Sequence, residues 1–454
     1  MKNLIIFLFF ALMQIAYTQN TAPEIEWAKC YGGSSFDYAE SIQQTSDGGY
    51  IIAGSTESND CDITGDHGDF DYWIVKLNSS GNIQWQKSLG GSDDDEAYSI
   101  QQTNDGGYII AGLSGSNDGN VTGNHGDWDY CIVKLNSSGN IEWQECLGGS
   151  SNDYAISIQQ TNDGGYIVAG SSESSDGDVT GNHGHFDCWL VKLNFNGNIQ
   201  WEKCIGGSDG EGALSIQQTT DSGYIVAGYS SSEDGDVTGN NGASDYWIVI
   251  LNSSGNIERQ KSLGGSSIDY ANSIRKTSDG GYIVAGWSIS NDGDVIGNHG
   301  KYDYWLVKLD LDLNIKWQKC LGGKDNDAHS ILQTSDDDYI VAGSSESSDG
   351  DVAGNHGGWD FWIVKLKPES TEVAENNSKN NSGFSISPNP VTDNIQIFIS
   401  EYLFDKSIEI YNITGIKVFE ENVNNTIMQI NIESLPAGVY FIRIGNETKI
   451  FVKK

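Results

Sequence analysis

A segment of 58 residues returns six times along this chain. The motif D-G-G-Y-I-V-A-G marks the register, and its tyrosine recurs at intervals of 58, 58, 58, 58 and 57 residues, at Tyr50, Tyr108, Tyr166, Tyr224, Tyr282 and Tyr339. A tryptophan marks a second column, at Trp27, Trp85, Trp143, Trp201 and Trp317. Self-similarity at a fixed period predicts an array of supersecondary units, each of which buries its apolar face against its neighbours.

Each copy carries four β-strand signals and no helical one. In the third copy, Ser157–Thr161 alternates polar and apolar residues, and Tyr166–Gly170 is a short apolar run. A long polar loop leads to Cys188–Leu193, and a tight turn returns the chain through Ile199–Lys203. Such alternation and short apolar runs, bounded by Gly, Asn and Asp, are typical of strands. Four antiparallel strands repeated six times predict an all-β fold, a six-bladed β-propeller of four-stranded blades.

The two ends of the array predict how the ring closes. The chain enters on a segment that matches a fourth strand, Glu24–Lys29, before any first strand has appeared. It leaves the array after a third strand, Trp362–Leu366, with no fourth strand following. We therefore expect the entering segment to complete the last blade, since an unpaired sheet edge is prone to aggregation.

Outside the array the composition changes three times. Residues 1–18 combine an early lysine, an apolar run and small or polar residues after it, which predicts a secretory signal peptide ahead of the propeller at 19–366. Residues 367–383 are polar and unpatterned, as in a linker. Residues 384–454 alternate Ile, Phe and Val with polar residues, which predicts a small C-terminal β-sandwich. No other stretch is apolar for long enough to cross a bilayer.

The last segment carries motifs known from a family. It opens on Ser385–Pro390 (S-I-S-P-N-P), has Leu435–Arg443 (L-P-A-G-V-Y-F-I-R) near its end and closes on Lys453 and Lys454. It resembles the type A C-terminal sorting domain of the type IX (Por) secretion system of Bacteroidetes. That resemblance implies export by the type IX machinery and a location that is secreted or on the outer surface of a Gram-negative cell. The motif residues are Pro388, Asn389, Pro390, Leu435, Pro436, Gly438, Tyr440, Lys453 and Lys454.

The repeats also resemble β-propeller blades of secreted proteins from the same bacteria, and this resemblance implies no activity. Charge narrows the choice of partners instead. The formal net charge is −38, from 63 acidic against 25 basic residues. Nucleic acid and anionic lipid are therefore poor partners. A solvated acidic surface is the simplest account of the charge.

Seven cysteines in a secreted chain allow disulfides. A register that buries the apolar residues of the third and fourth strands on one face places Cys188 directly opposite Cys204. The same register leaves Cys131 and Cys146 on opposite faces, so we expect those two not to bridge. An odd number of cysteines leaves at least one thiol free or paired with another chain.

Oxygen-bearing side chains recur in the long loop between the second and third strands. Three columns of the repeat carry them: Asp60, Asp118, Asp176, Asp234, Asp292 and Asp349; Asp62, Asn120, Asp178, Asp236, Asp294 and Asp351; and Asp71, Asp129, Asp187, Asp245, Asp303 and Asp360. Such oxygens in a Gly-rich loop are the ligands that calcium takes, although the spacing does not fit an EF-hand. The alternative is that Asp and Asn accept local backbone hydrogen bonds and hold a repeated turn. We favour the turn and keep calcium as the candidate cofactor.

An aromatic column lies beside these loops, at Phe70, Trp128, Phe186, Tyr302 and Trp359. In a four-stranded meander the second-to-third loop and the connection between blades share one face, so aromatics and oxygen-bearing groups should gather there. Aromatic rings beside such groups suit a carbohydrate ligand. The alternative is that these rings wedge between adjacent blades.

No motif in the chain predicts a catalytic residue. H-E-x-x-H, G-x-S-x-G and phosphate-binding loops are absent from the sequence. The repeats vary mildly everywhere, and no copy gathers acid, base and metal-binding groups. The sequence thus favours a non-enzymatic binding or adhesion propeller for an extracellular glycan or protein. The alternative is a hydrolase or lyase that acts on extracellular polysaccharide.

Overall fold

The computed structural model describes residues 27–454 apart from 66, 324–325, 335–336, 356, 358, 368–383, 388–389, 400–402, 405, 414 and 446. Two compact units make up the chain, Met1–Glu369 and Ser370–Lys454. The predicted signal peptide and all but the first residue of the predicted linker lie outside the described residues. Within the described part, no helix has the length and apolarity needed to span a membrane.

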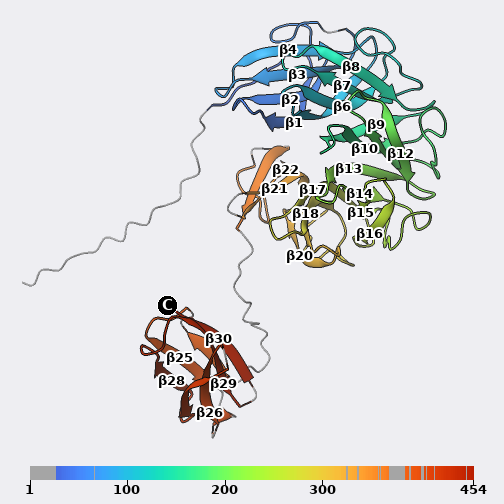
Figure 1. Cartoon of the computed structure of the whole chain (residues 1–454). Helices are drawn as coiled ribbons and strands as arrows, with labels where there is room; N and C mark the ends of the chain where they lie inside the picture. Colours follow the sequence, from blue (N-terminus) through green and yellow to red (C-terminus); the bar gives the residue numbers. More distant parts are fainter. Residues whose placement is uncertain are drawn as a thin grey trace, which may run out of the picture. The chain divides into compact units, whose positions relative to one another are not determined.

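The first unit is built of six antiparallel sheets, called blades 1 to 6, which follow one another in chain order (Figure 1). Their strands are β1 (Asp37–Gln44), β2 (Tyr50–Thr56), β3 (Asp71–Leu77) and β4 (Ile83–Leu89) in blade 1; β5 (Asp95–Gln102), β6 (Tyr108–Ser114), β7 (Asp129–Leu135) and β8 (Ile141–Leu147) in blade 2; β9 (Asp153–Gln160), β10 (Tyr166–Ser172), β11 (Asp187–Leu193) and β12 (Ile199–Ile205) in blade 3; β13 (Glu211–Gln218), β14 (Tyr224–Ser230), β15 (Asp245–Leu251) and β16 (Ile257–Leu263) in blade 4; β17 (Asp269–Lys276), β18 (Tyr282–Ser288), β19 (Asp303–Leu309) and β20 (Ile315–Leu321) in blade 5; and β21 (Asn326–Gln333), β22 (Tyr339–Ser345) and β23 (Asp360–Leu366) in blade 6. The predicted all-β propeller of repeated four-stranded blades is confirmed.

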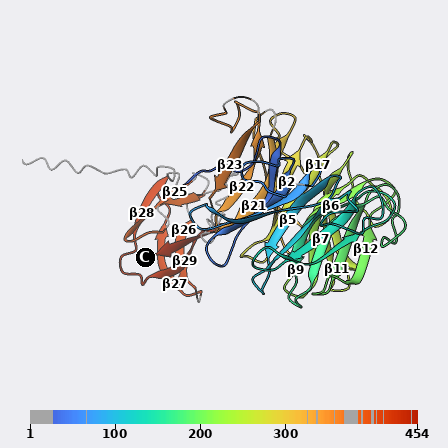
Figure 2. The ribbon, with the colours of Figure 1, turned by 90° about the horizontal axis from the view of Figure 1, so that it is seen from above.

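Consecutive blades pack face to face, and each such contact is called a seam. Strand β9 of blade 3 lies beside β5 and β7 of blade 2 (Figure 2). Five core clusters are each shared by two neighbouring blades, whereas a sixth is formed by blade 1 with Trp27 and Tyr31. The cluster at the seam of blades 2 and 3 joins Ile109 and Ile132 to Val168 and Val191. A middle strand such as β11 is buried at every residue because it has a blade on each side. This two-sided burial explains the continuous apolar runs of the second and third strands.

A tyrosine hydroxyl crosses four of the seams. It donates to a backbone carbonyl of the next blade, and the pairs are Tyr72 to Cys131 at 3.1 Å, Tyr130 to Trp189 at 2.7 Å, Tyr246 to Trp305 at 2.8 Å and Tyr304 to Trp362 at 2.9 Å. Because each hydroxyl is buried, the bond both satisfies the phenol and fixes the register of neighbouring blades. The same column holds Cys188 in blade 3 and Phe361 in blade 6, and neither has a phenol to donate.

The ends of the array differ from the seams between them. Blade 6 has three strands among the described residues, in the order β21-β22-β23. Of the segment expected to be its fourth strand, residues 24–26 lie outside the described part, and Trp27–Lys29 carry no strand. Trp27 nevertheless packs on Tyr50 at a ring-centroid distance of 5.8 Å, as Trp85 packs on Tyr108 at 5.7 Å. The tryptophan column was therefore assigned correctly, and pairing of its strand with β23 stays a prediction.

The predicted cysteine register is wrong. Leu193 does lie opposite Ile199 as expected, but a β-bulge next to this pair places Trp201 opposite Lys192 instead of Val191. Beyond the bulge every pair is shifted by one residue, so Cys204 faces Trp189. The same bulge recurs in blades 1, 2, 4 and 5. One extra residue exchanges the two faces of a strand, which is why the prediction failed.

The bulge also reverses the prediction for the other cysteine pair. Cys131 of β7 lies directly opposite Cys146 of β8. Both side chains are buried in the core cluster shared by blades 1 and 2. The expectation that these two residues lie on opposite faces is therefore wrong.

The C-terminal unit is a small β-sandwich, as predicted. One sheet has the order β24-β25-β28 and the other β27-β26-β29-β30. Their bounds are β24 (Phe384–Ser387), β25 (Asn394–Ile399), β26 (Ser407–Asn412), β27 (Lys417–Asn422), β28 (Ile427–Asn431), β29 (Gly438–Ile444) and β30 (Glu447–Lys453). Alternate residues of both sheets, such as Ile395, Ile397, Ile408 and Ile442, meet in one core and are fully buried. The period-2 pattern of the sequence explains this arrangement.

Candidate functional site

The predicted aromatic column lies where the long loop of one blade meets the first strand of the next. The amide of Asp153, at the start of β9, donates to the carbonyl of Trp128 at 2.6 Å, and the amide of Glu211 donates to the carbonyl of Phe186 at the same distance. The long loop and the connection between blades therefore share one face, which is called the loop face. Three predicted rings, Trp128, Tyr302 and Trp359, are exposed there, at 37%, 37% and 54%.

Two groups of rings gather on the loop face. At the seam of blades 2 and 3, Tyr154 lies 6.0 Å from Trp128 and 5.6 Å from Phe186, measured between ring centroids. Phe70 makes a similar contact with Tyr38 at 5.9 Å. Phe186 and Phe70 are partly buried, and each contacts a tyrosine in the first strand of its own blade.

The larger group lies between blades 4 and 5 and was mostly missed by sequence reasoning. Tyr229 stacks on Tyr270 at 4.0 Å, Tyr270 lies 4.7 Å from Trp287, and Trp287 lies 5.2 Å from Tyr302. Only Tyr302 was predicted. Tyr229 and Trp287 occupy a strand column that holds Leu113 and Ser171 in other blades, so departure from the repeat was the available signal.

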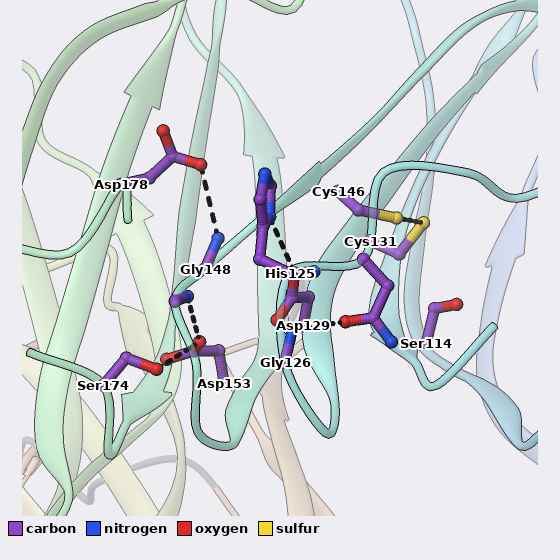
Figure 3. Close-up of polar contacts among 12 residues, drawn as sticks. Ser114, His125, Gly126, Asp129, Cys131, Cys146, Gly148, Asp153, Ser174 and Asp178 are labelled. Atoms are coloured by element: carbon purple, nitrogen blue, oxygen red, sulfur yellow. Dashed lines mark hydrogen bonds and ion pairs between the residues drawn. The ribbon is translucent and has the colours of Figure 1, made fainter. Parts of the chain in front are cut away.

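The first two acidic columns bind backbone amides of the turn between blades. Asp118 Oδ1 accepts from the Ser92 amide at 2.8 Å, and Asp176 Oδ1 accepts from Ser150 at 2.7 Å. Asp178 Oδ2 accepts from Gly148 at 3.4 Å (Figure 3). Such contacts are what a turn-holding role requires. Among the described residues, no group of three or more His, Cys, Asp or Glu side chains is arranged to hold a metal ion.

The third column, immediately before the third strand, is bound on one oxygen only. Asp129 Oδ2 accepts from the backbone amide of His125 at 2.7 Å and lies 2.9 Å from His125 Nδ1. Asp129 Oδ1 is buried and has no hydrogen-bond partner. The Oδ1 atoms of Asp71, Asp187, Asp245 and Asp303 are likewise buried without a hydrogen-bond partner.

A second carboxylate faces this bare oxygen across a glycine. A Cβ atom on Gly148 would lie 2.7 Å from Asp129 Oδ1 and 2.5 Å from Asp153 Oδ2, so only glycine fits between the two carboxyl groups. Figure 3 shows Asp129 and Asp153 near Gly148. The arrangement recurs at Gly90, between Asp71 and Asp95, and at Gly264 and Gly206.

Burial is the main electrostatic effect at this pair. Loss of water raises the pKa of Asp153 to about 6, against hydrogen bonds from Ser172, Gly149 and Ser174 that lower it. Burial also raises the pKa of Asp129, and hydrogen bonds from His125 oppose the rise. Sequence reasoning missed the column of Asp95, Asp153 and Asp269, although its recurrence in the L-G-G-S-x-x-D connection was a usable signal.

A cavity of about 430 Å³ opens at the seam of blades 1 and 2, beside the short turns between strands. Its lining includes Asp47, Lys76, Trp85 and Tyr108. The Lys76 ammonium is 3.0 Å from Asp47 and its side chain is buried except for 4% of its surface. The predicted aromatic column does not contribute to this cavity.

In the C-terminal unit the motif residues near the end hold the last hairpin together. The Tyr440 hydroxyl donates to the carbonyl of Pro436 at 2.8 Å, and its ring stacks on Phe451 at 5.5 Å. Leu435 packs against the core, and Gly438 begins β29. Pro388 and Asn389 lie outside the described residues.

This segment also matches a known family. Residues 385–454 fit the model of the secretion system C-terminal sorting domain. The match confirms the resemblance to the type IX sorting domain. The chain is thereby an exported protein of the type IX pathway, secreted or carried on the outer surface, and the sorting domain is the part that the secretion machinery recognises.

Comparison with solved structures gives distant likenesses. PorZ, a surface component of the type IX secretion system of Porphyromonas gingivalis, is 10% identical with a TM-score of 0.30, over 94% of this chain and 61% of its own. Sqt1 from Chaetomium thermophilum is 11% identical with a TM-score of 0.37, over 92% and 96%. A subtype N11 neuraminidase-like protein of a bat influenza A virus is 12% identical with a TM-score of 0.35, over 71% and 86%. Among curated proteins nothing matches the chain.

Proposed function

We propose that this exported protein is a non-enzymatic binding or adhesion propeller whose loop face takes an extracellular carbohydrate. The observation that supports this proposal most is the exposure of Trp128 and Tyr302 at the edges of the two aromatic groups. A ring that is held by neighbouring rings and exposed on one face can stack on a sugar ring with little loss of conformational entropy. Polar loop residues beside the rings provide partners for sugar hydroxyls.

The charge of the protein supports a neutral or cationic ligand. With a net charge of −38, repulsion disfavours polyanions such as nucleic acid. An extracellular protein partner would use the same exposed rings, and the binding experiment below separates the two. Calcium at the acidic loops stays a hypothesis, so binding is best measured with and without it.

The alternative activity is hydrolysis or lysis of an extracellular polysaccharide. The paired carboxyl groups Asp129 and Asp153 have the raised pKa that a general acid needs. However, both residues are fully buried, so a substrate on the loop face would not reach them. The carboxyl pair therefore fits a role inside the seam better than catalysis.

The test is a screen of the mature protein on arrayed glycans and purified polysaccharides. We expect Trp128→Ala and Tyr302→Ala to weaken binding about tenfold each, since tenfold corresponds to about 1.4 kcal/mol, within the range of an aromatic contact. Phe195→Ala is the matched control, because this ring is 66% exposed but lies in the turn between β11 and β12. Equal losses for all three variants, or no glycan binding at all, would contradict the proposal.

Export gives a second test that does not depend on the ligand. Deleting residues 384–454 should prevent the protein from reaching the outer surface or medium of its native host, because the sorting domain lies there. The truncated chain should keep the melting temperature of the propeller unit, since the two units are separately compact. Surface delivery of the truncated chain would show that export has another signal.

A further inference from the structure

Two thiols meet inside blade 2. Cys131 and Cys146 are directly opposite on the neighbouring antiparallel strands β7 and β8, and their sulfur atoms are 2.8 Å apart. Both residues are buried, at 0% and 5% exposure, so no other protein thiol can approach them in the folded state. Directly opposite residues of an antiparallel pair have Cβ atoms close to the separation that a disulfide spans, and the short distance between the sulfur atoms shows that these two side chains point toward each other.

Blade 3 provides an internal comparison. It also has a cysteine in each of its third and fourth strands, but Cys188 lies opposite Ile205 and Cys204 lies opposite Trp189. Cys188 packs in the core shared by blades 3 and 4, whereas Cys204 packs in the core shared by blades 2 and 3. The two sulfur atoms of blade 3 thus point to opposite faces of one sheet.

The export route supplies the oxidising conditions. A chain that carries a type IX sorting domain leaves the cytoplasm and crosses the periplasm, where thiols of folding proteins are oxidised. We propose that Cys131 and Cys146 form a disulfide in the exported protein. The two thiols release two protons and pass two electrons to an external disulfide, such as that of a periplasmic thiol oxidase, which becomes a dithiol.

Burial determines when this bond forms. Desolvation raises the pKa of the Cys131 thiol, so the reactive thiolate is scarce once the blade has folded. Oxidation therefore belongs to the folding stage, and the finished bond resists reductants for the same reason. A protein made in a reducing cytoplasm keeps both thiols, because its core is closed before any oxidant arrives.

The disulfide would restrain the part of blade 2 next to Trp128, a candidate ligand-binding residue. Trp128 lies three residues before Cys131, immediately ahead of β7. A link from β7 to β8 at this point restrains the start of the strand from which the loop emerges. The inference does not depend on carbohydrate binding, since it rests on the pairing of the two strands.

The experiment counts thiols in the full chain secreted by its native host. The protein is denatured without reductant, alkylated, digested and measured by mass spectrometry, with a reduced sample in parallel. Of the seven cysteines, two should be protected, so five alkylated thiols are expected without reductant and seven with it. The protected peptides should contain Cys131 and Cys146. Seven alkylated thiols in both samples, or a link that uses Cys188 or Cys204, would overturn the proposal.

A stability measurement checks the same bond independently. The oxidised protein should lose a few degrees of melting temperature when it is reduced after unfolding and refolded in reductant, as is usual for a bond that closes a short loop. Cys131→Ser should no longer respond to reductant. Cys188→Ser is the matched control and should keep the response. An unchanged melting temperature on reduction of the wild-type chain would count against the bond.

Discussion

Two strands with nearly the same sequence have opposite surroundings in this protein. β11 (D-C-W-L-V-K-L) is buried at every residue, whereas β23 (D-F-W-I-V-K-L) alternates between partly buried and exposed. Leu190 of β11 is 0% exposed, and its counterpart Ile363 of β23 is 67% exposed. An apolar run of this kind can be buried on both faces of the sheet only where a neighbouring blade covers each face. The difference between a seam and an end of the array comes from context alone.

The largest expected effect is the difference in stability between a substitution at Leu190 and the same substitution at Ile363. Leu190→Asp should unfold the propeller unit, since an unpaired charge in a closed seam costs more than about 4 kcal/mol. Ile363→Asp should change the free energy of unfolding by no more than about 0.5 kcal/mol, as is usual at an exposed site. Urea titration followed by tryptophan fluorescence measures both.

A large loss at Ile363 would break the comparison and would indicate that the end face is covered in solution. Ring closure predicts what covers it, namely the face of blade 1 that bears Ile42, which is 64% exposed. A double-mutant cycle between Ile42→Asp and Ile363→Asp decides the matter. Additive effects would indicate that blades 1 and 6 are not in contact. A coupling energy above about 0.5 kcal/mol would indicate that Ile42 and Ile363 contact each other.

A medium effect concerns the carboxyl pairs of the seams. Because the pKa of Asp153 in the folded state is about 6, above its usual value near 3.8, the folded protein binds a proton that the unfolded chain releases. The stability from this group should therefore be fully present below about pH 4, fall as the pH rises through about 6 and then level off. Asp95 and Asp245 add to the same trend.

Asp153→Asn should remove the loss of stability that ionisation of this carboxyl group causes at neutral pH. We expect it to raise the melting temperature at pH 7.5 by a few degrees and to flatten the pH dependence, since a shift of two pKa units corresponds to about 3 kcal/mol at most. The chain itself has Asn326 at this register position in blade 6. Asp105→Asn is the control and should be destabilising, because hydrogen bonding from Thr103 and ion pairing with the buried Lys134 outweigh burial and hold the pKa of Asp105 at about 2. A lower melting temperature for Asp153→Asn would show that the charge is needed in the seam.

The smallest expected effect is that of a chelator. The loop carboxylates of Asp118 and Asp176 already accept backbone hydrogen bonds, so removing calcium should move the melting temperature by less than about 1 °C. Calorimetry in chelator and in millimolar calcium makes the comparison. A drop of several degrees in chelator would favour a calcium site in these loops, and Asp176→Asn would then test one blade at a time.

The sequence alone could predict what depends on period and pattern. Strands such as β10 and β11 follow from apolar runs, and the sorting domain follows from its motifs. The bulge beside Leu193 could not be predicted, because one inserted residue leaves the composition of the strand unchanged while it exchanges the two faces. For the same reason the sequence did not reveal that Cys131 lies opposite Cys146. Rings such as Tyr229 and Trp287 were missed because a comparison of repeats favours what recurs over what departs from it.

The tyrosines that cross the seams have a mechanical consequence. Their column holds Cys188 in blade 3, so among the five described seams the one between blades 3 and 4 lacks this cross-blade hydrogen bond. This seam divides the array into blades 1–3 and blades 4–6. A pulling force on the array should therefore separate the blades at this seam first.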